Sequence, residues 1–199
     1  MKYEPANSGL VKIYGKPEDY TDDQLASLQT LSDVMATGYH AALNAEVKPG
    51  YTVEVVGDDA VGLAGVIGAK LLGAEKIILL SHHDDRAQLD KEFGAIDVVS
   101  SRDEQAGQIA RPGAVIGRVG VPHAEPKSNQ LFWKNLGLRG AIASVTKPNK
   151  EVLLQAVLDG KINPGKVFTK SFDLDHIQEA YEAMSNREAI KSLIIVNDK

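Results

Sequence analysis

The chain has 199 residues, 43% of them hydrophobic, which is enough to bury the core of one ordinary domain, but its apolar runs are too short to span a membrane. Its formal net charge of −5 argues against broad binding to nucleic acid, because there is no excess of basic side chains to neutralise phosphates. The absence of cysteine excludes disulfide bonds and thiolate zinc sites, and with no secretory signal at the N-terminus we expect a cytoplasmic protein without a membrane partner.

The N-terminal part predicts a short strand around Leu10–Tyr14 and then helix. Thr21 is a good N-cap, because two aspartates follow it at the positive end of the expected helix. Apolar residues recur with a helical period from Leu25 onward, and Gly38 is a possible break between two helices. The turn Lys48–Gly50 then leads into the first strand of the main fold.

A β-α-β unit at residues 50–81 is the centre of the sequence. The β-rich run Thr52–Val56 ends at Gly57, the Gly/Ala-rich helical pattern Ala60–Leu72 follows, and a second strand covers Lys76–Leu80. This length is typical of a dinucleotide-binding fold. Further expected strands alternate with helices and lie at Ile96–Val99, Ala114–Val119, Leu138–Ala143, Val167–Thr169 and Leu193–Val196.

This alternation predicts an α/β fold with a Rossmann-like, mainly parallel sheet and helices on both faces. We divide the chain into an N-terminal segment (1–46), a dinucleotide-binding-type domain (47–160) and a C-terminal strand-helix-strand segment (161–199).

The turn after the first strand carries an imperfect glycine fingerprint. The pattern Gly-x-Gly-x-x-Gly is met by Gly57 and Gly62, but Asp59 stands at the middle glycine, followed by Ala60 and Val61. At about 4 Å and an effective dielectric constant near 20, a carboxylate there repels a diphosphate by roughly 4 kcal/mol, which corresponds to about a thousandfold in affinity as an upper value. We hypothesise that the carboxylate itself occupies the anion site. The glycines have a structural reading too, because tight strand-helix packing requires them with or without a ligand.

Ser81 ends the second strand, where an acidic residue is typical of a site specific for NAD. A neutral serine followed by His82 and His83 favours the 2′-phosphate of NADP, although a solvated turn explains the same residues. The run from His82 to Asp85 also suggests a metal site, but adjacent residues rarely point at one ion, and an aspartate here can cap the next helix.

Several segments, in the same order along the chain, together resemble a known family. They are 31–42, 48–50, 110–114, 119–123, 132–135 with 138–140, 160–164, and 179–181 with 190–191. The chain resembles the medium-chain, zinc-type alcohol dehydrogenases over nearly all of its length. The resemblance implies a cofactor-binding Rossmann domain and NAD(P)-dependent chemistry, and it places His123 near a nicotinamide.

Three departures from that family shape our expectations. Its members have a catalytic domain ahead of the cofactor domain, and this chain begins almost where that domain ends. Asp33 matches a position that supplies a zinc ligand in some members, but one carboxylate cannot hold catalytic zinc, so we expect none. Only residues 100–111 separate the third strand from the next turn, so the sheet is expected to be one strand short. The strand at 114–119 is a candidate to pair with the first strand in its place.

The functional expectation is an NAD(P)-binding-type domain whose binding of NADP is weak or lost and which lacks dehydrogenase activity on its own. The alternative is an NADP(H)-dependent oxidoreductase that acts zinc-free or with a partner chain, and no catalytic residue stands out for either. We expect a homodimer through the Leu138–Ala143 edge strand, because an unpaired apolar edge is a liability. The tail strand Ser192–Val196 needs a partner, either the N-terminal strand or a second subunit.

Overall fold

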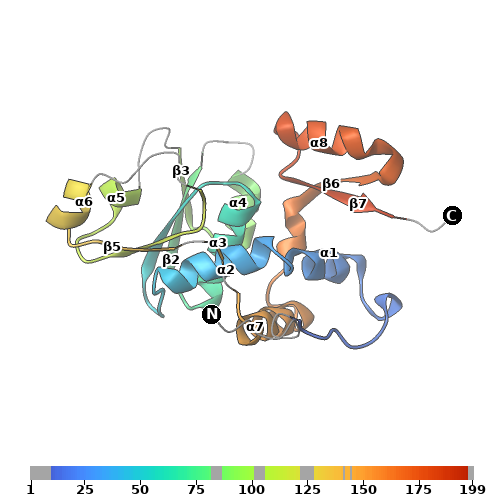
Figure 1. The fold of residues 1–199 in the computed structure, drawn as a ribbon, viewed down its shortest axis with the longest axis horizontal. Coiled ribbons are helices and arrows are strands. Elements are labelled where there is room, and N and C mark those ends of the chain that lie inside the picture. Colours follow the sequence, from blue (N-terminus) through green and yellow to red (C-terminus); the bar gives the residue numbers. More distant parts are fainter. Residues whose placement is uncertain are drawn as a thin grey trace, which may run out of the picture. The chain divides into compact units, whose positions relative to one another are not determined.

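A computed structural model describes residues 10–81, 87–100, 106–121, 128–140, 142–143 and 145–196. The chain forms two compact units: a central unit, residues 33–146, and a terminal unit, residues 1–32 together with 147–199. The predicted segments 1–46, 47–160 and 161–199 group the elements differently, and that division stays a prediction. The α/β class with parallel strands is confirmed (Figure 1).

The central unit contains a parallel sheet of three strands in the order β1-β2-β3. These strands are β1 (Thr52–Val56), β2 (Lys76–Ser81) and β3 (Asp97–Ser100), joined through α3 (Ala60–Leu71) and α4 (Ala87–Phe93). The side chains of Ile77 and Leu79 on β2 are buried, as expected for the middle strand of a covered sheet. The predicted β-α-β unit is therefore present, with all of its carboxyl strand ends at one edge.

Two helices of the central unit, α2 (Val34–Asn44) and α3, pack closely against each other (Figure 1). A Cβ on Gly38 would lie 2.4 Å from the carbonyl carbon of Ala64, and a Cβ on Gly68 would lie 2.9 Å from Tyr39 Cα. Gly38 was a candidate helix break, and that prediction is wrong. The break between the two helices lies before α2 instead. Gly38 lies inside α2, where the absence of a side chain lets the backbones of α2 and α3 approach.

A separate two-stranded parallel sheet pairs β4 (Val115–Arg118) with β5 (Gly137–Gly140). The short helix α5 (Ala106–Ile109) precedes β4 in the chain, and a second one, α6 (Ser128–Trp133), lies between β4 and β5. Among the described strands β1 pairs with β2 alone, so the suggested move of the 114–119 strand next to β1 is wrong. β4 is held against α2 instead, because Gly117 has no side chain: its Cβ would lie 2.1 Å from the carbonyl oxygen of Ala41.

The terminal unit begins with α1 (Asp22–Thr30). Thr21 caps it as predicted, with its side chain accepting a hydrogen bond from the Gln24 amide at 3.2 Å. The helix packs on the turn η4 (Pro164–Val167), where Ser27 Oγ donates to Asn163 Oδ1 at 2.7 Å and accepts from the Gly165 amide at 3.1 Å. The other elements of this unit are η2 (Pro17–Asp19), α7 (Lys147–Leu158), β6 (Phe168–Asp173), η5 (Leu174–His176), α8 (Ile177–Ser185) and β7 (Lys191–Ile195).

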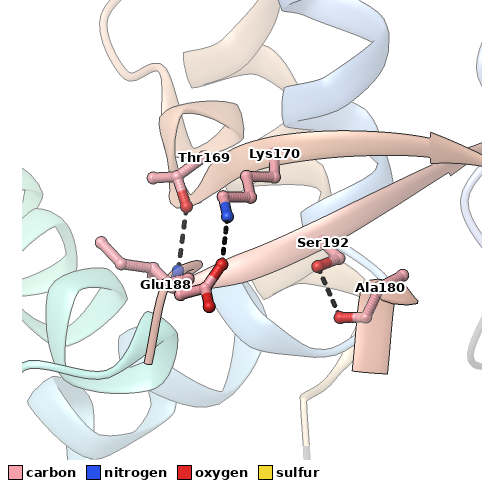
Figure 2. Close-up of polar contacts among 6 residues, drawn as sticks. Thr169, Lys170, Ala180, Glu188 and Ser192 are labelled. Carbon is pink, nitrogen blue, oxygen red and sulfur yellow. Dashed lines mark hydrogen bonds and ion pairs between the residues drawn. The ribbon is translucent and has the colours of Figure 1, made fainter. Parts of the chain in front are cut away.

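The C-terminal strands β6 and β7 form a parallel ribbon with α8 packed against it (Figure 1). Figure 2 shows its polar contacts: Lys170 Nζ lies 2.7 Å from Glu188 Oε2, and Ser192 Oγ donates to the Ala180 carbonyl at 2.9 Å. Of the two partners expected for the tail strand, an N-terminal strand or a second subunit, the first is wrong. Residues 10–14 form no strand, and β7 finds its partner in β6, which an intervening helix places parallel to it.

A titratable pair marks the entry to α8. The Asp173 carboxylate lies 2.6 Å from His176 Nδ1 and raises the pKa of His176, while the same hydrogen bond lowers the pKa of Asp173. Both groups are exposed to solvent at the start of the helix. Within the described part of the chain, no helix is both long and apolar enough to cross a membrane.

Candidate functional site at the first strand-helix turn

The turn from β1 to α3 has the backbone of a nucleotide-type turn. Gly57 has a φ of 108°, a conformation that side chains disfavour, and its amide donates to the Leu80 carbonyl at 3.1 Å. No atom lies within 4 Å of a Cβ built on Gly57, so its conformation, and not crowding, requires glycine there. The hydrogen bond ties the end of β1 to the end of β2, at the edge where ligands of parallel α/β folds bind.

Gly62 is fixed by packing. A Cβ at this position would lie 1.9 Å from the carbonyl oxygen of Gly57, so any side chain would push the helix away from the turn. Between these glycines, Ala60 is buried and Val61 is half-buried. The structural interpretation of the two glycines therefore has a direct basis, in packing for Gly62 and in backbone conformation for Gly57, whether or not a ligand binds.

Asp59 is the N-cap of α3. Its backbone is extended, and its Oδ1 accepts a hydrogen bond from the Gly62 amide at 2.7 Å, while its carbonyl accepts from the Leu63 amide at 2.9 Å. The first amides of a helix have no partner within the helix and are the donors that an anion at a helix start would use. Here one of those donors is already bonded to a carboxylate of the chain itself.

Ser81 and Asp58 form a buried pair beside this turn. Ser81 Oγ donates to Asp58 Oδ2 at 2.7 Å, and the two residues are 2% and 5% exposed. Ser81 therefore does not lie on a solvated turn, which was one reading of its position. Asp58 was not among the predicted site residues. The feature that could have indicated Asp58 is the parallel register of β1 and β2. It pairs Val56 with Leu80, so the residues that follow these two lie near each other.

The remaining predicted site residues lie apart from the turn or outside the described residues. His82 and His83 fall outside them, as does His123. Asp33 is exposed at the start of α2, where its Oδ1 accepts from Thr37 Oγ1 at 3.1 Å. Across the residues that the structure describes, there is no group of three or more His, Cys, Asp or Glu side chains that could hold a metal ion.

The turn as it stands does not fit a dinucleotide diphosphate. The position where a second glycine would allow close approach carries Asp59, and the carboxylate is bonded to the Gly62 amide. For a diphosphate to bind at this helix start, the Asp59 side chain must first leave its hydrogen bond and then remain close to a like charge.

No family model matches this chain. Among curated proteins it is 26% identical over 206 residues to "Alcohol dehydrogenase" of Cupriavidus necator, a match that covers 86% of this chain and 55% of that enzyme. It is 24% identical to "NADP-dependent isopropanol dehydrogenase" of Clostridium beijerinckii, over 88% of this chain and 61% of that enzyme. The chain thus spans little more than half the length of these relatives.

Solved structures give the same picture of the fold. "Alcohol dehydrogenase TADH from Thermus sp. ATN1" matches 86% of this chain and 59% of its own, with a TM-score of 0.77 and 22% identity. "Zinc dependent alcohol dehydrogenase 2 from Streptococcus pneumonia" matches 94% of this chain and 62% of its own, with a TM-score of 0.75 and 25% identity.

Proposed function

We propose that this chain, which resembles the medium-chain zinc-type alcohol dehydrogenases over most of its length, is a dinucleotide-binding-type domain that lacks dehydrogenase activity on its own. The observation that carries the proposal is the 2.7 Å hydrogen bond from the Gly62 amide to Asp59 Oδ1. This bond puts a carboxylate of the chain where the fold would otherwise receive a diphosphate.

The energetic argument has two parts. A bound diphosphate would lose the Gly62 amide as a donor, and it would face the Asp59 carboxylate. With about 4 Å between the charges and an effective dielectric constant near 20, the repulsion is on the order of 4 kcal/mol, or roughly a thousandfold in affinity. Because Asp59 is exposed, screening and side-chain rotation reduce this value, so it is an upper figure.

The test is a fluorescence titration with NADH and NADPH of the parent chain and of Asp59→Gly. We expect the parent to bind neither dinucleotide at low micromolar concentration, and Asp59→Gly to gain affinity by up to about a thousandfold. Gly62→Ala in the Asp59→Gly background is a second variant for comparison, because the new Cβ would meet the Gly57 carbonyl oxygen at 1.9 Å and should abolish the gain. Low micromolar binding by the parent refutes the proposal.

A second candidate function is an NADP(H)-dependent oxidoreductase that acts zinc-free or with a partner chain. Two observations favour it: the similarity to the NADP-dependent isopropanol dehydrogenase of Clostridium beijerinckii, and the neutral side chain of Ser81 at the end of β2. A thermal-shift assay with NAD, NADP and zinc separates the two candidates. A ligand present at a hundred times its Kd stabilises the fold by about 2.7 kcal/mol, so a clear rise of Tm with NADP would favour the oxidoreductase.

We also propose that the chain is cytoplasmic and forms a homodimer through the edge strand at 138–143. Among the described strands, β5 pairs with β4 alone. Ile142, just beyond β5, is 93% exposed, and Leu138 on β5 is 37% exposed. An unpaired edge with apolar side chains favours pairing with a second copy over exposure to solvent.

A further inference from the structure

The short helix α6 carries an aromatic pair, Phe132 and Trp133, whose side chains face solvent. Phe132 is 74% exposed and Trp133 is 80% exposed. The two rings meet edge to face, with their centroids 5.2 Å apart and an angle of 78° between their planes. An aromatic side chain has about 150–250 Å² of surface to bury, so the pair leaves roughly 300 Å² of apolar surface in solvent. An apolar patch of this size is often the place where a protein meets a partner.

The backbone around the aromatic pair holds it in position. The carbonyl of Lys134, the next residue, accepts from the Gly113 amide at 2.8 Å, and Lys134 Nζ donates to the Ala110 carbonyl at 3.0 Å. The chain then enters β5, where the Gly137 amide donates to the Ala114 carbonyl at 2.9 Å. Helix α6 is thus fixed at the end of the β4-β5 sheet where β5 begins (Figure 1). Because the rings are already positioned, covering them costs little conformational entropy.

The position of the pair relative to β5 fits a second copy of this chain. Two identical edge strands that pair around a two-fold axis run antiparallel, so the start of one strand lies beside the end of the other. Trp133 precedes β5, and the exposed Ile142 follows it. The aromatic pair of each copy is therefore directed towards Ile142 of the other copy, and the same apolar contact is made twice.

The charges near the aromatic pair do not oppose this arrangement. Arg139 lies on β5, so pairing around a two-fold axis brings the Arg139 side chains of both copies towards each other. In each chain Arg139 Nη1 lies 2.7 Å from Glu46 Oε1, which balances the guanidinium charge within its own copy. Both side chains are partly exposed, so solvent screens the remaining repulsion. The ammonium group of Lys134 is directed at carbonyl oxygens of its own chain.

We infer that Phe132 and Trp133 are the main apolar contact between two copies of this chain, where they pack against the end of β5 in the second copy. The inference rests on the proposed homodimer and adds the residues that stabilise it. Together with Ile142 and Leu138, the two rings offer several hundred Å² of apolar surface per copy, a large share of the roughly 800 Å² that each partner buries in a standard interface. Tryptophan is also among the residues that most often dominate interface energetics.

The test uses the fluorescence of Trp133, which is the only tryptophan of the chain. Emission wavelength and acrylamide quenching of the parent are measured at micromolar concentration, with light scattering on the same sample and N-acetyltryptophanamide as the exposed reference. We expect a dimeric parent whose emission lies at shorter wavelength than that of the reference and whose indole is quenched less. Ile142→Lys, which should be monomeric, should move both values to those of the reference.

Truncation of the rings gives a second measurement. Trp133→Ala and Phe132→Ala should each raise the Kd of the dimer by about thirtyfold or more, as expected when a dominant interface side chain is removed. Both side chains are exposed in the single chain, so their loss leaves the core intact. Tyr181→Ala is the matched control, because Tyr181 is also exposed (63%) but lies in the terminal unit, and this variant should keep the Kd of the parent.

The outcomes separate this inference from the proposals on which it builds. A dimeric parent whose indole is as accessible as the reference overturns the inference and leaves the homodimer standing. A Kd that neither Trp133→Ala nor Phe132→Ala changes does the same. A monomeric parent contradicts the homodimer and the inference together, and a shielded indole in such a monomer would show that the chain itself covers Trp133. None of these results bears on Asp59 and the diphosphate position.

Discussion

Asp59 caps a helix at the position where we propose that it opposes a ligand. As the N-cap of α3 it satisfies the Gly62 amide, which otherwise lacks a partner within the helix. Its negative charge also lies at the positive end of the helix dipole, which is a favourable placement. The residue that we propose to block the anion site therefore also stabilises the fold when no ligand is present.

This double role gives a prediction for stability at residue 59. Replacing Asp59 with alanine removes the cap and should lower the free energy of unfolding by about 1 kcal/mol, whereas replacement with glycine should cost only a few tenths. Urea denaturation of the parent and the two variants measures the difference. Equal losses for alanine and glycine, or no loss for alanine, would mean that the cap contributes nothing.

Residues 58 and 59 differ in how far their contacts follow from local sequence. The cap at Asp59 follows from local order alone, since an aspartate directly before a helical pattern bonds an amide three residues on. The Asp58–Ser81 bond joins residues 23 apart and depends on the parallel register of β1 and β2, which no local pattern supplies. The acidic partner of Ser81 therefore cannot be predicted without knowing that the two strands lie side by side.

At the scale of elements, close helix packing explains why Gly38 was misread. Glycine is a poor helix former, so its position in a helical pattern suggested a break. In the structure α2 continues through Gly38 because the backbone of α3 lies where a side chain would be. The break is at residues 31–33, between α1 and α2, and the two helices belong to different compact units.

A matched pair of glycine substitutions tests this packing. Gly38→Ala places a Cβ 2.4 Å from the Ala64 carbonyl carbon and should destabilise the fold by about 1–3 kcal/mol. Gly65→Ala, on α3, meets only Val55 Cγ1 at 3.6 Å and should be neutral or stabilising by up to about 1 kcal/mol, because alanine favours helix. Thermal unfolding of both variants gives the comparison. Equal effects would show that α2 and α3 do not meet as described.

Strand pairing is another feature that local sequence patterns predict poorly, because the paired residues lie far apart in the chain. The alternation of strands and helices was sufficient to predict a parallel α/β fold, and the structure confirms it. Which strand lies beside which was predicted less well, because pairing depends on contacts far apart in sequence. Gly117 against Ala41 holds β4 on α2, and β7 pairs with β6 in place of the N-terminal strand.

At the scale of the whole molecule, the proposed homodimer makes a direct prediction. Ile142→Lys introduces a charge at the 138–143 edge and should convert the dimer into a monomer, as measured by light scattering at micromolar concentration. Val152→Lys on α7 is the matched control, because Val152 is also exposed (47%) but lies in the terminal unit, and this variant should remain dimeric. A parent chain that is monomeric under these conditions contradicts the proposal.

The central claim is that the Asp59 carboxylate occupies the anion site at the start of α3. The most direct measurement is the ¹⁵N–¹H NMR signal of the Gly62 amide during titration with inorganic pyrophosphate, in the parent and in Asp59→Gly. We predict that the signal of the parent does not move at millimolar pyrophosphate, while the signal of Asp59→Gly shifts in a saturable way. A saturable shift in the parent, equal to that of the variant, would contradict the account.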